Sequence, residues 1–164
     1  IKAKHNNFLA LSLASSSKFA PNLFPIIKAL NGMAYGFFCS LIIGTILKQL
    51  GAFANITELV TWGEVATLLM GPAIGAGIGY AIDAKGLNLI SAIIAGCIGA
   101  GTFNGNVAGV GNPIVSFVAV IVAVEVTRFV QGKTPIDILI VPFTSIVAAG
   151  LVTIFVGPYL TNLI

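Results

Sequence analysis

The sequence predicts an all-α protein, a polytopic integral membrane helical bundle with about five transmembrane helices. Hydrophobic residues make up 57% of the 164 residues, and charged residues only 8%. An ordinary soluble domain carries roughly 25% charged residues. The mean hydropathy is +1.05. A small globule leaves too much surface exposed to hide this many apolar side chains from water. We therefore expect the chain to be surrounded by lipid.

Long uncharged runs define the expected helices. Leu30–Leu47 has no charge over eighteen residues, which as a helix extends about 27 Å, close to the ~30 Å hydrocarbon core. Lys48 is expected to close this span. Gly86–Val124 is uncharged over thirty-nine residues and is divided by a polar, glycine-rich stretch from Asn104 to Asn112. The expected transmembrane domain covers residues 30–164, with spans near 30–47, 64–82, 87–103, 113–130 and 136–158.

Helix starts are expected where a capping residue precedes an apolar run. Thr61 and Glu64 have the spacing of a capping box before the second span, and Pro72 is expected to kink that span. Asn112 followed by Pro113 is typical of a helix N-terminus. The fifth span is expected to start in the same way, with Thr134 as cap, Pro135 in the first turn and Asp137 at the positive end of the helix dipole.

The basic residues predict the orientation of the bundle. Residues 1–29 hold four of them and are expected to form an amphipathic or interfacial segment. If the N-terminus is cytoplasmic and five spans alternate, Lys48 alone falls outside, which follows the positive-inside rule. The basic residues are scattered singly, so we expect no nucleic-acid partner. Those expected inside are Lys2, Lys4, Lys18, Lys28, Lys85, Arg128 and Lys133.

Few polar side chains interrupt the apolar runs, and these are the candidate binding residues. The Asn104 to Asn112 segment is compatible with an external loop or with a re-entrant, cavity-lining segment, since irregular backbone at membrane depth needs protein or water around it. Its amides suit sugar hydroxyls because each offers donors and acceptors. Glu125 and Arg128 are three residues apart and can pair. Glu125 is a functional candidate as an intramembrane carboxylate, although the pair could also close the helix at the headgroups. The predicted substrate-binding residues are Asn104, Asn106, Asn112 and Glu125.

Small residues recur every fourth position on two of the expected spans. Such faces let helix backbones approach closely in lipid, either within one chain or in a homodimer, and they could also permit sliding or expose backbone to a substrate path. The residues are Gly71, Gly75 and Gly79 on one span and Ala92, Gly96 and Ala100 on the next.

Signatures of catalysis are absent from the sequence. It has no P-loop, no metal-spaced histidines or cysteines, and no nucleophile with a nearby base. We therefore expect no enzyme activity from this chain alone, no metal and no cofactor.

Three stretches carry a family resemblance: Phe24-Pro-Ile-Ile-Lys-Ala-Leu-Asn-Gly-Met-Ala-Tyr-Gly, Gly71-Pro-Ala-Ile-Gly-Ala-Gly-Ile-Gly and Gly111-Asn-Pro-Ile-Val. They resemble the IIC-type membrane subunits of the bacterial phosphotransferase system, in the class that includes a clostridial toxin-gene regulator. The similarity runs from about Phe24 onward. Members of the class are longer, so the chain is expected to be the N-terminal half.

The resemblance implies a multi-pass sugar permease of the bacterial inner (plasma) membrane. Separate cytoplasmic partners, phosphorylated on Cys or His, would phosphorylate the sugar that the membrane subunit presents. Two alternatives stay open at this point. One is a membrane-embedded sensor or regulator that has the permease fold without transport. The other is a different small-solute transporter or channel. The scarcity of charged residues argues against a channel that selects ions by rings of charge.

Overall fold

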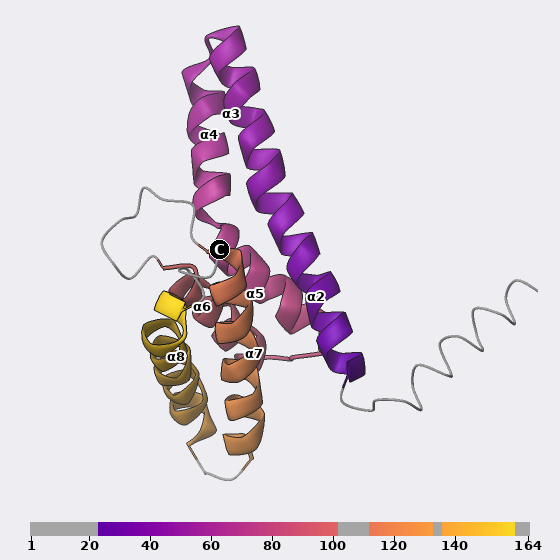
Figure 1. The fold of residues 1–164 in the computed structure, drawn as a ribbon, viewed down its shortest axis with the longest axis vertical. Coiled ribbons are helices and arrows are strands. Elements are labelled where there is room, and N and C mark those ends of the chain that lie inside the picture. Colours follow the sequence, from indigo (N-terminus) through magenta and orange to yellow (C-terminus); the bar gives the residue numbers. More distant parts are fainter. Residues whose placement is uncertain (1–22, 102–111, 133–135, 160–164) are drawn as a thin grey trace, which may run out of the picture.

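The computed structural model describes residues 23–101, 112–132 and 136–159, and these form helices joined by short turns (Figure 1). No strand occurs in these ranges. The predicted all-α class is therefore confirmed. In chain order the helices are α2 (Leu23–Phe37), the π-helical turn η1 (Phe38–Ile42), α3 (Ile43–Ala54), α4 (Thr57–Leu68), α5 (Met70–Ala81), α6 (Leu87–Gly99), α7 (Pro113–Val130) and α8 (Asp137–Phe155).

The first span is longer than the sequence pattern predicts. It runs without interruption through α2, η1 and α3, from Pro25 to Ala54, and so passes Lys48, the residue expected to close it. The helix ends instead at Asn55, which adopts a left-handed conformation with φ of 55°. The backbone N–H of Ile56 donates to the carbonyl of Gly51 at 2.9 Å, a bond typical of a Schellman-type C-terminus.

The capping box predicted at Thr61 and Glu64 is wrong. Helix α4 begins four residues earlier, at Thr57, and Thr61 lies inside it, with its hydroxyl donating to the Thr57 carbonyl at 3.0 Å. The bend expected near Pro72 is present. Helices α4 and α5 meet at Leu69 with a bend of 53°, and Pro72 lies in the first turn of α5, where its missing N–H leaves no bond unmade.

The later helices follow the predicted spans closely. Helix α6 begins at Leu87, and α7 has the predicted bounds. As predicted, Asn112 caps α7, because its side chain accepts from the backbone N–H of Ile114 at 3.0 Å. Helix α8 continues through Pro142. The predicted cap of α8 at Thr134 and Pro135 lies outside the described residues, as do residues 1–22 of the expected interfacial segment.

The described helices form a membrane-type bundle. Three of them are long and apolar enough to cross a bilayer, and the bent pair of α4 and α5 makes a fourth span if it is counted as one. Helix α6 is shorter, with thirteen residues or about 20 Å. A helical membrane protein is therefore confirmed, with three to four candidate spans and one short apolar helix in place of five full spans.

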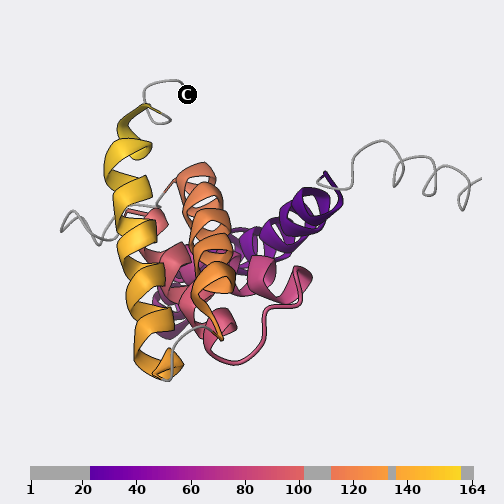
Figure 2. The same cartoon turned by 90° about the horizontal axis from the view of Figure 1, so that it is seen from below.

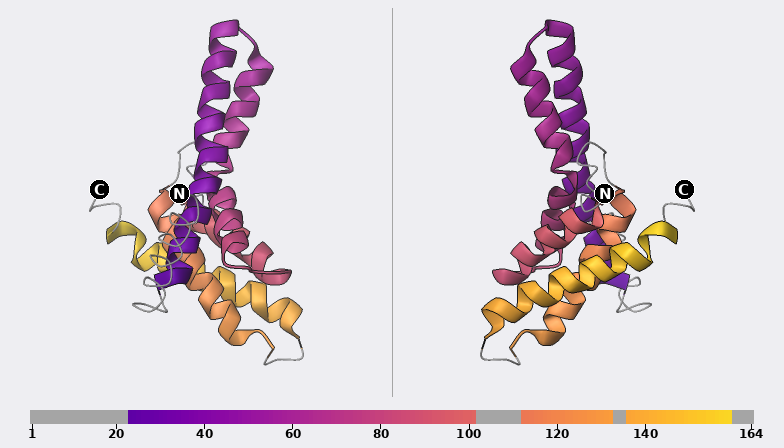
Figure 3. Two further views of the ribbon diagram at one scale, coloured as in Figure 1. Left: turned by 90° about the vertical axis from the view of Figure 1, so that its right-hand side faces the viewer. Right: turned by 90° about the vertical axis from the view of Figure 1, so that its left-hand side faces the viewer.

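Helix α5 lies at the centre of the arrangement. It packs against α2 on one side and α6 on the other, and α6 in turn packs against α7 and α8. Helices α7 and α8 lie side by side in the lower half of Figure 1 and again when the bundle is seen from below (Figure 2). Helices α3 and α4 form an antiparallel hairpin, hereafter the arm, that projects beyond the other helices (Figure 3). The contacts of the arm are mainly internal.

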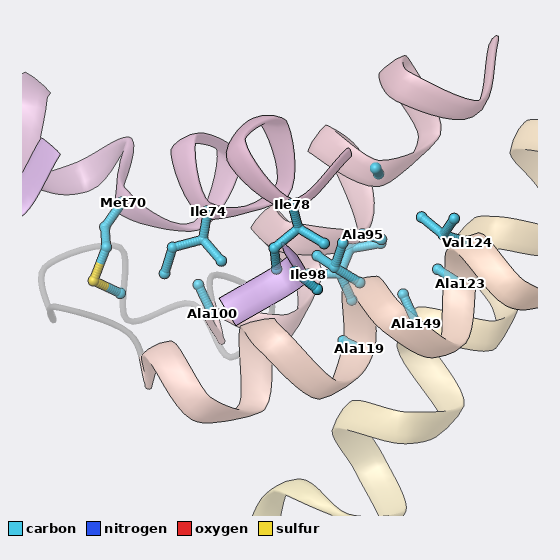
Figure 4. Packing of buried hydrophobic residues seen from close by; sticks show 13 residues of the cluster. Met70, Ile74, Ile78, Ala95, Ile98, Ala100, Ala119, Ala123, Val124 and Ala149 are labelled. Atoms are coloured by element: carbon cyan, nitrogen blue, oxygen red, sulfur yellow. The ribbon is translucent and has the colours of Figure 1, made fainter. Parts of the chain in front are cut away.

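The core is built from small side chains (Figure 4). Ile74 and Ile78 of α5 are fully buried against alanines of α6 and α7. The two predicted small-residue faces meet each other, since a methyl group placed on Gly71 would lie 2.6 Å from the Ala100 side chain, and one on Gly79 would lie 3.3 Å from the Ala92 side chain. These faces are used within one chain, so they lend no support to a homodimer.

Candidate functional site

The four predicted binding residues do not all fall in the described part of the chain. Asn104 and Asn106 lie in residues 102–111, outside it. Asn112 and Glu125 lie at opposite ends of α7. Asn112 caps its start, and Glu125 lies in its last two turns. Thirteen residues of helix separate them by about 20 Å. One monosaccharide cannot contact both side chains at once. Each of the two side chains lines a cavity of its own.

The first cavity, hereafter the Asn112 cavity, has a volume of about 620 Å³. It lies between the end of α6, the start of α7 and the end of α8. Much of its wall is backbone and small residues, because four glycines line it. The Asn112 oxygen is used in capping Ile114, so the amide NH₂ is the group this side chain can offer a ligand. The lining includes Gly101, Asn112, Gly150, Thr153, Gly157 and Pro158.

The second cavity, hereafter the Glu125 cavity, has a volume of about 290 Å³. It lies where the start of α2, the end of α5 and the end of α7 come together. Its walls are apolar except for one charged pair. The lining consists of Pro25, Ile26, Ala29, Ile82, Ile121, Glu125 and Arg128.

The charged pair in this cavity confirms the pairing predicted from the spacing of three. Arg128 Nη1 donates to Glu125 Oε1 at 3.3 Å. Its other terminal nitrogen, Nη2, donates to the backbone carbonyl of Ile82 at 2.7 Å. Ile82 caps the C-terminus of α5, where carbonyls lack partners within the helix and carry partial negative charge. Arg128 therefore fixes the end of α7 to the end of α5 and also orients Glu125.

The resulting geometry suits a neutral, hydroxylated ligand. A carboxylate has two oxygens and about four acceptor positions, of which Arg128 occupies only part. The Glu125 side chain is 64% exposed, so it is accessible from the cavity. Apolar walls with a few placed polar groups are usual for small-molecule sites.

Glu64 has a different role from the capping function expected of it. Its carboxylate faces Lys48 across the arm, with the closest nitrogen and oxygen 4.0 Å apart. Both side chains are partly exposed, at 40% for Lys48 and 56% for Glu64. The pair links α3 to α4 and lies on neither cavity.

Sequence reasoning missed the backbone part of the Glu125 site. The Ile82 carbonyl is 46 residues from Arg128 in the chain, and nothing in an isoleucine marks its carbonyl as a ligand. It also missed a hydrogen bond between two amide side chains, in which Asn88 Nδ2 donates to Gln131 Oε1. The only available signal was that each is a polar residue beside a long apolar run.

No cluster of three metal-ligating side chains occurs among the residues that the structure describes. Comparison with curated proteins and with solved structures gave no match. A family model described as phosphotransferase system, EIIC, matches residues 27–164, which is most of the chain. The family is a transport component and not catalytic by itself. The chain belongs to the EIIC family of phosphotransferase-system membrane components.

Proposed function

We propose that the chain is a sugar-translocating subunit of a phosphotransferase system, and that separate cytoplasmic partners phosphorylate the sugar. The observation that carries this proposal is the pair of cavities at opposite ends of α7. Each contains one of the predicted polar residues, Asn112 or Glu125. Between them lies a core of fully buried side chains. Two cavities separated by a packed core give a solute an entry and an exit that no open channel joins.

The proposal assigns Asn104, Asn106, Asn112 and Glu125 to sugar recognition. Asn112 offers an amide NH₂, and Glu125 offers carboxylate oxygens held by Arg128. Sugar hydroxyls donate and accept, so they can bond to both types of group. In this proposal the two cavities are successive stations of one sugar, because the distance between them excludes simultaneous contact.

We also propose that the N-terminus is cytoplasmic, in a bacterial inner membrane. Support comes from the basic residues near the Glu125 cavity. Lys28 belongs to the first turns of α2, Lys85 to the turn after α5, and Arg128 to the end of α7. Positive charge favours the cytoplasmic side. A single-cysteine variant, Lys85→Cys with Cys39 and Cys97 replaced by serine, should react with an impermeant thiol reagent only from the cytoplasmic side.

The test of transport is sugar binding and uptake by the full-length protein. A panel of sugars is titrated onto the purified protein, and uptake is measured in membrane vesicles that contain the phosphotransferase partners. We expect saturable binding of one sugar class, weakened about 10-fold or more by Glu125→Gln, because a hydrogen bond to a charged group contributes about 1.5–3 kcal/mol. Glu58→Gln is the control, since this exposed carboxylate lies on the arm.

The same experiment separates the alternatives. Binding without uptake, together with sugar-dependent gene expression, would support a sensor or regulator. Uptake of other solutes that does not saturate would support a channel. Absence of both sugar binding and sugar uptake would overturn the proposal.

A further inference from the structure

Two buried polar atoms on α6 have no hydrogen-bond partner among the described residues. They are Asn88 Oδ1 and Ser91 Oγ. The Asn88 side chain belongs to a residue only 6% exposed, and Ser91 is 1% exposed. Residues three apart lie on the same helix face, so the two atoms belong to one place on α6. A buried polar group without a partner is costly, and the hydrocarbon core of a bilayer offers no bulk water to supply the missing bond.

Ser91 differs in this respect from the other buried hydroxyls. The described residues include five buried serines and threonines, and four of their hydroxyls have partners. Two bond to a carbonyl of their own helix, and two reach the carbonyl of a neighbouring helix. The four are Ser40, Thr127, Ser116 and Ser145. Helix packing in this protein therefore gives the other buried hydroxyls a partner within the chain. The Ser91 hydroxyl has none among the described residues, which leaves it available to a ligand or a water.

Polar groups from three helices converge at this position. The other end of the Asn88 amide donates to Gln131, the residue that follows α7. The hydroxyl of Ser145 on α8 donates to the Ser91 backbone carbonyl at 3.3 Å. Figure 2 shows the end of α7 and the start of α8 close together at the lower edge of the picture. The two unpartnered atoms thus lie where α6, α7 and α8 meet, away from the lining of the Asn112 and Glu125 cavities.

The two atoms together specify the chemistry of their partner. Asn88 Oδ1 accepts only, so it needs a donor, whereas Ser91 Oγ can donate or accept. If the Asn88 oxygen and nitrogen exchange places, the unpartnered atom becomes a donor instead. A hydroxyl satisfies either case because it donates and accepts at once. An anion would be repelled by an amide oxygen, and the described residues contain no group of three His, Cys, Asp or Glu side chains that could hold a metal cation.

We propose that Asn88 and Ser91 form a buried binding site for one hydroxyl group, which comes from an internal water or from the transported sugar. Buried waters in proteins typically make about three hydrogen bonds to polar groups of this kind. The sugar source rests on the proposed transport function, but the water source does not. The same two residues bond to Gln131 after α7 and to Ser145 of α8 through their other polar atoms, so the occupant lies beside the contacts between these helices.

The test compares Ser91→Ala with Ser116→Ala in the full-length protein without sugar. Ser116 is the matched control, because it is equally buried and its hydroxyl bonds to the Gly96 carbonyl at 2.9 Å. If a water occupies the site, both variants lower the thermal unfolding midpoint by a similar shift, about 1–6 °C. A truly unpartnered hydroxyl gives the opposite sign for Ser91→Ala, because its removal relieves an unmet desolvation penalty.

The second arm measures sugar binding by Ser91→Ala. If the midpoint without sugar does not fall but sugar affinity weakens about 3–10-fold, the hydroxyl belongs to the sugar. If the midpoint does not fall and sugar affinity is unchanged, the proposed site is overturned. Should no sugar bind the parent protein, the transport proposal fails by itself, and the sugar-free midpoint alone decides whether the site exists.

Discussion

Replacing Gly75 with alanine should weaken the α5–α6 contact on which the bundle depends. Gly75 faces α6, and a methyl group added there would lie 2.9 Å from the carbonyl carbon of Ala92 and 2.9 Å from the Cα of Ile93. Favourable contacts between carbon atoms lie at about 3.5–4.0 Å. Both opposing atoms are backbone, so no side-chain rotation can relieve the overlap, and the two helices must separate.

The expected magnitude follows from two opposing terms. Inserting a methyl group into a packed interior typically destabilises by about 1–3 kcal/mol. Alanine favours a helix over glycine by about 0.5–1 kcal/mol. The two ranges leave a net loss of about 0–2.5 kcal/mol, and we use the middle of this range, about 1–2 kcal/mol, for Gly75→Ala. At about 2–4 °C per kcal/mol for a chain of this size, the unfolding midpoint should fall by roughly 2–8 °C.

Gly150→Ala is the matched control for this substitution. Gly150 lies inside α8, and a methyl group there would meet nothing within 4 Å. Only the helix-propensity term remains, so the midpoint should rise by roughly 1–4 °C. The assay is thermal unfolding in detergent, followed by the reaction of Cys97 on α6 with a thiol-reactive dye in a Cys39→Ser background, because Cys39 is exposed in the folded protein. A midpoint for Gly75→Ala equal to or above that of Gly150→Ala would refute the close backbone contact.

Three further predictions concern single contacts. Arg128→Met removes the bond to the Ile82 carbonyl and should lower the unfolding midpoint by about 2–4 °C; this assumes about 1 kcal/mol, reduced from the usual value of a charged bond because the side chain is 41% exposed. An unchanged midpoint would mean that Arg128 does not fix α7 to α5. Asn112→Ala should destabilise by about 1 kcal/mol through loss of the α7 cap, whereas Asn112→Ser should cost only a few tenths; equal losses in denaturant titrations would contradict capping. A double-mutant cycle on Lys48 and Glu64 should give a coupling below about 1 kcal/mol, as for exposed pairs, and a coupling above about 2 kcal/mol would show that lipid or protein desolvates the pair.

Local signals predicted α7 well. Its start is determined by the Asn112 cap and by Pro113, which is suited to the first turn, and both act within a few residues. The pairing of Glu125 with Arg128 is also local, since a spacing of three places both on one face. Features that depend only on adjacent turns of one helix can be predicted from a single sequence, and the structure confirms both of these predictions.

The first two spans show where local signals fail. The motif of Thr61 and Glu64 fits a capping box, but the same spacing also occurs inside any helix. The contact between α3 and α4 determines whether Thr61 starts a helix or lies inside one. A methyl group on Gly51 would lie 2.7 Å from the backbone nitrogen of Val60, so α3 and α4 pack closely beyond the expected boundaries, where both are helical. Lys48 does not end its helix, because a charged side chain by itself does not break a helix. Its ammonium group also faces the Glu64 carboxylate across the arm.

The distribution of close contacts bears on how a solute could pass from one cavity to the other. Glycines of α5 face both neighbours, with Gly75 against α6 and Gly77 against Gly32 of α2. Such backbone contacts hold α2, α5 and α6 at fixed spacing, because any separation loses many small attractions at once. Helix α7 also approaches α6 closely, because a methyl group on Gly99 would lie 2.7 Å from the Cα of Ser116, and near its other end Arg128 bonds to the Ile82 carbonyl that ends α5. Close backbone contact therefore links α7 to this group as well, so the solute path of the proposed transport function needs helices that touch through their backbones to separate.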